Sequence, residues 1–295
     1  MGGKHLADPP HCGGVDLAGV GASPHVIRSE YRGIHGPTVW SEVLGEHAFP
    51  IATLTFLHSF AMAPQLSIVV PVYNEAEIMP RALPSLLDDL DGTPYSYEVL
   101  VVENGSTDDT AKLAVELAGD RPVSVLSLDE PNYGGAIREG MLAATGTWSV
   151  VFDIDYTSMP FLDEVMASDD ADIVLASKRN PDSVDRRPAL RRLATAVFNL
   201  LLRVILSSKV SDTHGIKAFR LSSVSSLIDQ VESRQDLFDT ELVIRSERAG
   251  LRIREVPVVV EELRPARSSV LARAPRTILG LFRLRRRLSG EPTRQ

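Results

Sequence analysis

Two carboxylates separated by one residue follow a short, mostly apolar stretch, and their spacing suits metal binding. The stretch spans residues 148–152, and Asp153 and Asp155 come directly after it. A short apolar run is typical of a buried strand, and open parallel α/β sheets bind ligands beyond the carboxyl ends of their strands. Two carboxylates there could hold a divalent cation that in turn binds a diphosphate. The alternative is a solvated strand end or a helix cap, because acidic pairs are common.

The elements around this pair alternate between strand and helix. Apolar runs predict strands at residues 66–72, 98–102 and 123–127, and helical patterns follow at 76–90, from 107 onward and at 136–144. Pro71 is expected at the end of the first strand, where no ladder donor is needed. This alternation predicts an α/β fold with a mostly parallel, doubly wound (Rossmann-like) sheet flanked by helices.

Two common phosphate-binding motifs are absent from the sequence. No G-x-G-x-x-G follows the first strand, and no G-x-x-x-x-G-K occurs anywhere. Dinucleotide-dependent and P-loop functions therefore lose their usual support. If a nucleotide binds, its phosphates must be held largely through a metal, which strengthens the interest in Asp153 and Asp155.

Charge is distributed unevenly over the 295 residues. The net charges of residues 1–62, 63–185 and 186–295 are −2, −17 and +11. The acidic middle suits a metal and disfavours nucleic acid, whereas the basic last third suits a phosphate-bearing acceptor or an anionic membrane surface. The single cysteine, Cys12, excludes an internal disulfide framework and is compatible with the cytosol.

Residues 1–62 show no sustained helical or strand period, and we expect a disordered extension. They hold six of the seven histidines without a tight metal-ligand spacing. Their apolar run at 51–61 is shorter than the roughly 20 residues that a spanning helix needs. We hypothesise that the natural protein begins at Met62.

Five motifs in order resemble the family 2 glycosyltransferases of GT-A fold. The resemblance covers residues 65–271, and within it the later motifs look like the dolichyl- or polyprenyl-phosphate mannosyl- and glucosyltransferase branch. The motifs are Val70-Pro71-Val72-Tyr73-Asn74-Glu75, Val102-Glu103-Asn104-Gly105-Ser106-Thr107-Asp108, Asp153-Ile154-Asp155, Asp172-Ile173-Val174-Leu175-Ala176-Ser177-Lys178-Arg179, and Ser211-Asp212-Thr213-His214-Gly215-Ile216-Lys217-Ala218-Phe219-Arg220 followed by Phe238-Asp239-Thr240-Glu241.

The resemblance implies a nucleotide-sugar site at the strand ends. Residues expected to bind the nucleotide sugar are Pro71, Tyr73, Glu75, Val102, Glu103, Asn104, Gly134, Gly135, Asp153, Ile154 and Arg179. Glu103 departs from the Asp more common in the family, so the base, guanine or uracil, stays open. Gly134 and Gly135 either allow close approach of a ligand or form an ordinary turn into a helix.

The resemblance also implies a metal and its ligands. Asp155 would be the principal ligand of Mg²⁺ or Mn²⁺, with Asp153 and Thr157 beside it, and hard oxygen ligands favour these cations. Arg179 would neutralise a diphosphate oxygen with its rigid, always-charged fork, unless it forms a surface salt bridge.

The remaining motifs concern the acceptor and catalysis. Asp212, Thr213, Lys217, Arg264 and Arg267 are expected to bind the acceptor. Asp239 and Glu241, two residues apart at the start of a helix, would orient the acceptor or act as a base. The alternative for this pair is stabilisation of the helix N-terminus.

The basic end predicts a surface that binds membranes. Residues 263–290 contain eight arginines and no acidic residue, interleaved with apolar side chains, and residues 190–206 are also apolar with arginines. Such arginine-rich amphipathic helices lie in the membrane interface. We therefore divide the chain into an extension (1–62), a GT-A domain (63–262) and a basic amphipathic tail (263–295).

These features predict an inverting hexosyltransferase. It would move a hexose from GDP-mannose or UDP-glucose to a polyprenyl or dolichyl phosphate, as a peripheral protein at the cytoplasmic membrane face. A soluble or protein-borne acceptor, and a non-catalytic nucleotide-sugar-binding protein, are the alternatives. A membrane-protein partner or a homo-oligomer is left open.

Overall fold

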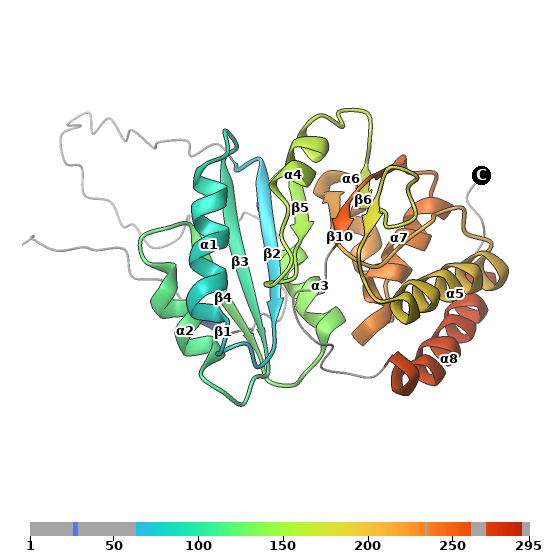
Figure 1. Cartoon of the computed structure of the whole chain (residues 1–295), viewed down its shortest axis with the longest axis horizontal. Helices are drawn as coiled ribbons and strands as arrows, with labels where there is room; N and C mark the ends of the chain where they lie inside the picture. The colour runs from blue at the N-terminus through green and yellow to red at the C-terminus, as the bar shows by residue number, and fades with distance from the viewer. Residues whose placement is uncertain (1–25, 29–62, 234, 261–269, 291–295) are drawn as a thin grey trace, which may run out of the picture.

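A twisted eight-stranded sheet runs through the protein (Figure 1). The computed structural model describes residues 26–28, 63–233, 235–260 and 270–290. In spatial order the strands are β1 (Val26–Arg28), β4 (Val123–Leu128), β3 (Tyr97–Asn104), β2 (Leu66–Val72), β5 (Trp148–Val151), β8 (Lys217–Arg220), β6 (Ile173–Ala176) and β9 (Ile253–Val256). All neighbours are parallel except β8, which runs antiparallel to β5 and β6. The predicted mostly parallel α/β fold is confirmed.

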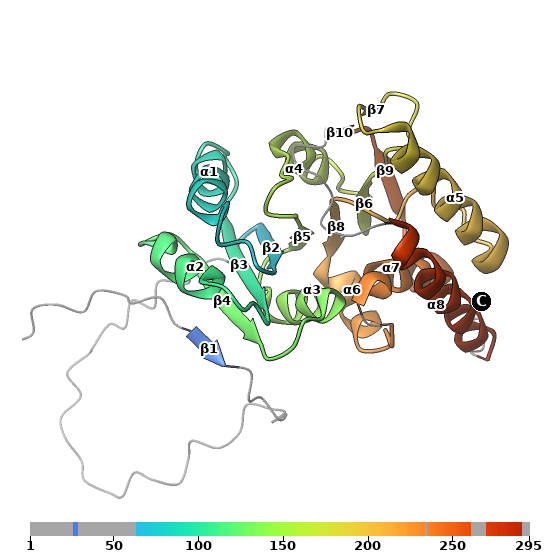
Figure 2. The ribbon, with the colours of Figure 1, turned by 60° about the horizontal axis from the view of Figure 1, so that its bottom comes forward.

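Helices cover both faces of the sheet (Figure 2). The helices α1 (Met79–Asp91), α2 (Thr110–Ala118) and α4 (Met159–Met166) pack on one face, and α3 (Tyr133–Ala143), α6 (Leu221–Ile228) and α7 (Phe238–Arg248) pack on the other. Successive side chains of a strand point to opposite faces. In β2, accordingly, Ile68 and Val70 join the core under α1 while Val69 joins the core under α3. Such double burial explains why β2 is a continuous apolar run.

The remaining two helices form a layer at one edge of the molecule. Helices α5 (Ala189–Leu206) and α8 (Val270–Ser289) lie side by side in both views. Between them, and against η1 (Gln235–Leu237) and α7, is a third core that contains Leu202, Ile205, Leu281 and Leu284. A short pair of strands, β7 (Val184–Asp185) and β10 (Val259–Val260), lies near the start of α5. Within the described part of the chain, no helix is long and apolar enough to cross a membrane.

Some element boundaries differ from the predicted ones. Helix α1 begins at Met79 rather than at 76, with Pro80 in its first turn, where a missing N–H costs no helical hydrogen bond. Strand β5 ends at Val151, and a turn closed by the Tyr156 N–H donating to the Asp153 carbonyl (2.9 Å) follows. Strand β1 pairs with β4 inside a segment for which the sequence indicates no strand, because three residues show no period. The rest of residues 1–62 lies outside the described residues.

Candidate functional site

The candidate site lies where β2, β3 and β5 end. Asp155 and Thr157 line a cavity of about 280 Å³ whose opposite wall is α1. The side chains lining it from this side are Ile78, just before α1, and Arg81, Ala82, Ser85 and Leu86 of α1. Because β3 and β5 flank β2 on opposite sides, this cavity lies at the point where the strand order reverses, which is where doubly wound sheets bind ligands.

Asp153, two residues before Asp155, contacts α3. The Tyr133 hydroxyl donates a hydrogen bond to Asp153 Oδ1 (3.1 Å). Burial raises the pKa of Asp153, and the negative charges of Asp155 and Asp239 raise it further, whereas Lys217 and the Tyr133 hydrogen bond oppose the rise. These influences show that Asp153, Asp155, Lys217 and Asp239, separated by up to 86 positions in the sequence, come together in space.

A buried ion pair between Lys217 and Asp239 belongs to this cluster. Lys217 Nζ lies 2.5 Å from Asp239 Oδ2, and the two side chains are only 2% and 6% exposed. Burial by itself would raise the pKa of Asp239, but the charge and hydrogen bond of Lys217, with His214 and the Thr240 N–H, bring it below its usual value. The antiparallel strand β8 causes this arrangement, because it places Lys217 opposite Val151, two residues before Asp153.

The segment before β8 forms a second buried pair that the sequence did not indicate. Lys178 Nζ lies 2.9 Å from Asp212 Oδ2 and also donates to the carbonyl of His214. The His214 N–H donates to Asp212 Oδ1 (3.0 Å), and the Thr213 and Thr240 hydroxyls are 3.1 Å apart. Asp212 and Thr213 are therefore adjacent to the Lys217–Asp239 pair, and Lys178 completes the network. Its position beside Arg179 at the end of β6 was the available signal.

The loops after β2 and β3 are tied to each other. The Asn74 N–H donates to Ser106 Oγ (2.9 Å), the Thr107 N–H donates to Asn74 Oδ1 (2.8 Å), and the Glu75 N–H donates to Thr110 Oγ1 (2.8 Å). Asn74 has a φ of +51°, a conformation that Asn tolerates better than most residues. Tyr73, Asn74 and Glu75 thus lie on a loop held in one shape at the predicted edge.

Pro71 occupies the place expected for it at the end of the ladder. The Val69 carbonyl accepts from the Phe152 N–H (3.0 Å) on the β5 side. The backbone nitrogen of Pro71, two residues later, faces the same neighbouring strand. Pairing between β2 and β5 has already ended there, at Val69–Val151. Its missing N–H therefore breaks no ladder bond, and on its other side it is in register with the buried Val102.

Glu103 and Asn104 are turned into the surrounding loops. The Glu103 carboxylate accepts a hydrogen bond from the Ser106 N–H, and Asn104 Oδ1 accepts one from the Asn132 N–H. Both side chains are 5% exposed. The contact of each residue with a nucleotide base remains a prediction. In the structure, their hydrogen bonds stabilise the turn at Gly105.

Gly134 and Gly135 serve the packing of the chain on itself. A Cβ at Gly134 would lie 2.5 Å from the Gln235 carbonyl oxygen and 2.6 Å from Phe238 Cβ. A Cβ at Gly135 would lie 2.6 Å from the Asn132 side chain, which caps α3 by accepting from the Gly135 N–H (3.0 Å). Both glycines lie in the first turn of α3, and the approach of a ligand to either of them remains a prediction.

Glu241 points away from the Asp153 cluster. Its carboxylate is fully buried and pairs with Arg245 (2.8 Å) and, on α8, with Arg287 (2.9 Å), while the Ser233 N–H donates to it (2.8 Å). These contacts hold the pKa of Glu241 below its usual value against the effect of burial. These contacts join α7 to α8, so the Glu241 carboxylate has arginine partners away from Asp239.

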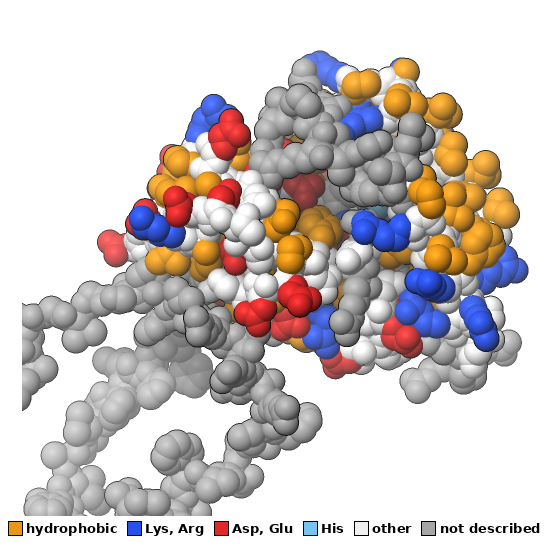
Figure 3. All heavy atoms as spheres, turned by 90° about the horizontal axis from the view of Figure 1, so that it is seen from below, with side chains coloured by type: hydrophobic (Ala, Val, Ile, Leu, Met, Phe, Trp, Pro, Cys, Tyr) orange, Lys and Arg blue, Asp and Glu red, His pale blue; other side chains and the backbone are white. Residues whose placement is uncertain are grey.

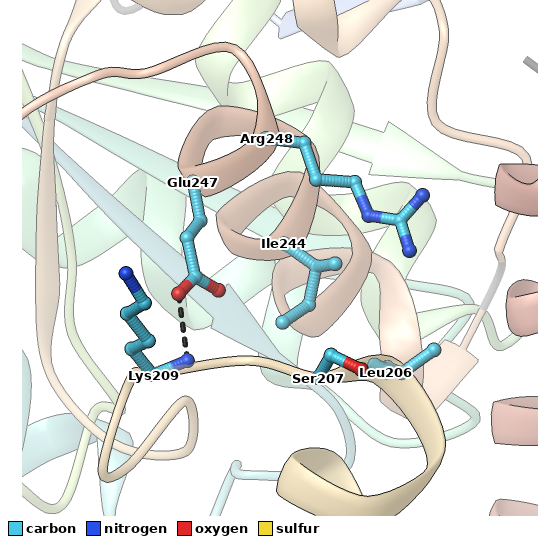
Figure 4. Close-up of a pocket in the computed structure, with 6 residues that line it drawn as sticks. All are labelled: Leu206, Ser207, Lys209, Ile244, Glu247 and Arg248. Atoms are coloured by element: carbon cyan, nitrogen blue, oxygen red, sulfur yellow. Dashed lines mark hydrogen bonds between the residues drawn. The ribbon is translucent and has the colours of Figure 1, made fainter. Parts of the chain in front are cut away.

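The other predicted residues are dispersed. Arg179 is exposed, three residues after the end of β6, and Ile154 is buried between Asp153 and Asp155. Arg264 and Arg267 lie outside the described residues. A second cavity of about 390 Å³ lies between the end of α5 and α7 (Figure 4), and none of the predicted site residues lines it. There the Lys209 N–H donates to Glu247 Oε1 (2.6 Å).

The donor set around Asp155 fits a hard divalent cation. Two carboxylates and the Thr157 hydroxyl are the oxygen ligands that Mg²⁺ and Mn²⁺ prefer. Among the residues the structure describes, no group of three or more His, Cys, Asp or Glu could hold a metal. A cation at Asp155 would therefore take its further ligands from a diphosphate and water, as Mg²⁺ commonly does.

Residues 67–227 match the family described as "Glycosyl transferase family 2". The chain belongs to this family, as its motifs indicated. It is 34% identical over 207 residues to Glycosyltransferase AglD of Haloferax volcanii, covering 67% of this chain but 33% of that protein. It is 32% identical over 231 residues to a dolichyl-phosphate beta-glucosyltransferase of Drosophila melanogaster, covering 70% of this chain and 71% of that protein. The chain thus spans about a third of the Haloferax relative.

A solved structure shares the fold. Glucosyl-3-phosphoglycerate synthase from Mycobacterium tuberculosis, in complex with Mn²⁺, UDP-glucose and phosphoglyceric acid, superposes with a TM-score of 0.56 at 21% identity. The match covers 75% of this chain and 79% of the other. At this identity the likeness concerns the fold alone.

Proposed function

We propose that this protein transfers a hexose from a nucleoside-diphosphate sugar to a polyprenyl or dolichyl phosphate, with inversion at the anomeric carbon. The observation that carries the proposal is the cavity at the carboxyl edge of the sheet, where Asp155 faces α1 and a buried Lys217–Asp239 pair lies behind Asp153. The family and the dolichyl-phosphate glucosyltransferase relatives support it. Their names favour glucose, and hence UDP-glucose, over GDP-mannose.

The donor would lie across the ends of β2, β3 and β5. Tyr73 and Glu75, on the loop braced by Asn74, would flank the base and ribose, and Arg179 would reach a diphosphate oxygen. A divalent cation on Asp155, with Asp153 and Thr157 near it, would offset charge developing on the leaving diphosphate. The mycobacterial neighbour with Mn²⁺ and UDP-glucose supports this assignment.

The acceptor needs orientation rather than deprotonation. A phosphate monoester has a second pKa of about 6 and is already largely dianionic at neutral pH. One of its oxygens would attack the anomeric carbon as the bond from that carbon to the diphosphate oxygen breaks, with the electron pair leaving on the nucleoside diphosphate. The paired segment Asp212–Lys217 would position this phosphate, since Lys178 and Lys217 fix its two ends.

A soluble acceptor is the second candidate. The mycobacterial neighbour was crystallised with phosphoglyceric acid, which also presents a phosphate monoester. The two candidates differ in the acceptor and in whether the product is lipid-soluble.

A panel of labelled donors tests the proposal. UDP-glucose and GDP-mannose would be offered with Mg²⁺ or Mn²⁺ and with polyprenyl phosphate or 3-phosphoglycerate. We expect label from UDP-glucose in the organic phase with polyprenyl phosphate. Label only in a water-soluble product would favour the second candidate, and no transfer or donor hydrolysis under any condition would reject both.

A further inference from the structure

Helix α5 carries an apolar stripe on its outward side. Leu190, Leu193, Val197, Leu200 and Val204 recur at intervals of three and four residues, so they lie on one side of the helix. Each is between 48% and 66% exposed. The opposite side of α5 is already buried through Leu202, Ile205 and Leu206. Helix α5 is thus apolar on both sides, and the described residues cover only one of them.

Helix α8 extends this surface. Leu279 and Phe282 are 51% and 54% exposed, while Leu281, Leu284 and Leu288 of the same helix pack against α5. We call the large exposed apolar side chains of α5 and α8 the outer face; its members are Leu190, Leu193, Val197, Leu200, Val204, Ile278, Leu279 and Phe282. Because α5 and α8 share one core, both helices contribute side chains to the outer face.

The two helices are fixed to each other and to the domain. Arg285 Nη1 donates to the Ile205 carbonyl (3.1 Å) at the end of α5, where helical carbonyls lack partners. Arg287 pairs with the buried Glu241 of α7 (2.9 Å). The helices that carry the outer face are therefore held in place by contacts within the folded domain.

The charges beside the outer face have one sign. Residues 189–206 and 270–289 contain no Asp or Glu. Exposed arginines of these helices are Arg192, Arg203, Arg276, Arg283, Arg285 and Arg286. In Figure 3 hydrophobic side chains gather along the right-hand side, where α5 and α8 lie, and Lys or Arg side chains border them.

We propose that the outer face inserts into the interface of an anionic lipid bilayer, with α5 and α8 lying along the membrane surface. Apolar side chains on one side and arginines next to them are the features by which helices enter this interface. Anionic headgroups supply the negative charge that the two helices lack, and each arginine near such a surface strengthens binding.

A second copy of the chain fits this face less well. A two-fold contact would place each outer face against the same face of another copy. The arginines of one copy would then approach those of the other without a carboxylate from either helix, and like charges in an interface are costly. Lipid is the partner of complementary charge.

The inner side of α5 links this surface to the candidate site. The Phe198 ring meets the His214 ring edge-on, with centroids 4.4 Å apart, and the His214 N–H bonds to Asp212. The bilayer would thus lie against the helix that packs on the Asp212–Lys217 segment. The proposal does not depend on sugar transfer, because docking needs neither donor nor acceptor.

Vesicle flotation of the full chain tests the proposal. Partition would be measured without nucleotide or polyprenyl phosphate, on phosphatidylcholine vesicles with and without phosphatidylglycerol. We expect binding to the anionic vesicles, weakened by salt. The double variant L193Q/L200Q should lower the partition coefficient about tenfold or more, and R203Q/R283Q should lower it on the order of tenfold at low salt. The matched control is Leu142→Gln, which changes an exposed apolar residue of α3 and should bind like the parent.

A gain of signal complements these losses. In the single variant Leu200→Trp, added anionic vesicles should shift the tryptophan emission to the blue and brominated lipid should quench it, whereas Leu142→Trp should respond no more than the parent. Equal partition of the parent and both double variants, or binding that ignores anionic lipid, would overturn the proposal. So would a dimer, detected by light scattering, that L193Q/L200Q dissociates while vesicles bind neither protein.

Discussion

Two carboxylates of the candidate site, Asp153 and Asp239, have pKa values that are shifted in opposite directions. Burial raises the pKa of both. Only Asp239 has a cation in direct contact, Lys217, which outweighs burial and keeps this carboxylate ionised. Asp153 has a hydroxyl instead, and negative charges lie nearby. Lys217 therefore balances one negative charge fully and a second in part, which makes it the electrostatic centre of the cluster.

Replacing Lys217 tests this view at the level of stability. Lys217→Met leaves Asp239 buried without its cation, and breaking a buried pair in this way typically costs about 3–5 kcal/mol. We expect a loss of this size in the free energy of unfolding, measured by urea denaturation at neutral pH. The double variant K217M/D239L removes both charges and should recover most of the loss. A single variant as stable as the parent would show that the pair is not formed.

His214 gives the stability of the fold a pH dependence of known sign. Burial lowers its pKa from the ordinary 6.5. Between that lowered value and 6.5 the unfolded chain binds the proton more readily than the folded one, so stability falls as pH drops below about 6.5. The slope is at most about 1.4 kcal/mol per pH unit for one group.

His214 is the only histidine after residue 58, so the effect can be isolated. His214→Gln should flatten the unfolding free energy measured between pH 7 and the pH at which carboxylates begin to titrate. An unchanged slope in the variant would mean that the His214 ring is accessible to protons in the folded state.

Asp155 is the residue on which the proposed transfer depends most. Asp155→Asn removes the charge at the cavity wall, and we expect transfer to fall by about 100-fold or more, the size of effect seen when one electrostatic stabiliser of an active site is removed. The melting temperature should stay near that of the parent. Asp182→Asn, an exposed carboxylate after β6, is the control that should keep full activity.

At the scale of elements, the contact of α3 with α7 depends on a glycine. In Gly134→Ala the new Cβ would lie within 2.6 Å of both the Gln235 carbonyl oxygen and Phe238 Cβ. Overpacking of this kind costs about 1–3 kcal/mol, which should appear as a lower melting temperature. Gly290→Ala, whose Cβ would lie 3.6 Å from its nearest neighbour, should change little.

The sequence predicted the elements with strong local signals. Strand β2 matches its predicted range, because its residues are buried on both faces and all but Ser67 and Pro71 are aliphatic. Helix α5 begins within one residue of the apolar run that predicted it. The Asp153–Asp155 pair was placed at the correct edge because β5 is parallel to β2.

Contacts that depend on chain crossing could not be read from local patterns. The approach of Lys217 to Asp153 requires β8 to insert antiparallel between β5 and β6. Likewise Glu241 looked equivalent to Asp239 in sequence, but a rotation of two helical positions points it toward Arg287 of α8. The contacts of Gly134 with Gln235 of η1 and Phe238 of α7 are likewise not visible in the local sequence, because they join segments about 100 residues apart.

At the scale of the whole molecule, the candidate site and the outer face lie on either side of the Asp212–Lys217 segment. The sugar donor is water-soluble and would enter over the carboxyl edge of the sheet, whereas a polyprenyl phosphate is confined to the bilayer. An outer face held in the interface brings the acceptor-side segment to the membrane, so the phosphate headgroup need not leave the lipid surface.

This arrangement predicts that outer-face substitutions affect transfer only when the acceptor is in a membrane. With polyprenyl phosphate in anionic vesicles, L193Q/L200Q should reduce initial rates about tenfold, following its partition. With a short-chain, water-soluble prenyl phosphate the same variant should match the parent, because Leu193 and Leu200 point away from the core. Asp155→Asn should fail with both acceptors. If L193Q/L200Q lost equal activity with both acceptors, the defect would lie in the site. If it lost activity with neither, membrane docking would not contribute to transfer.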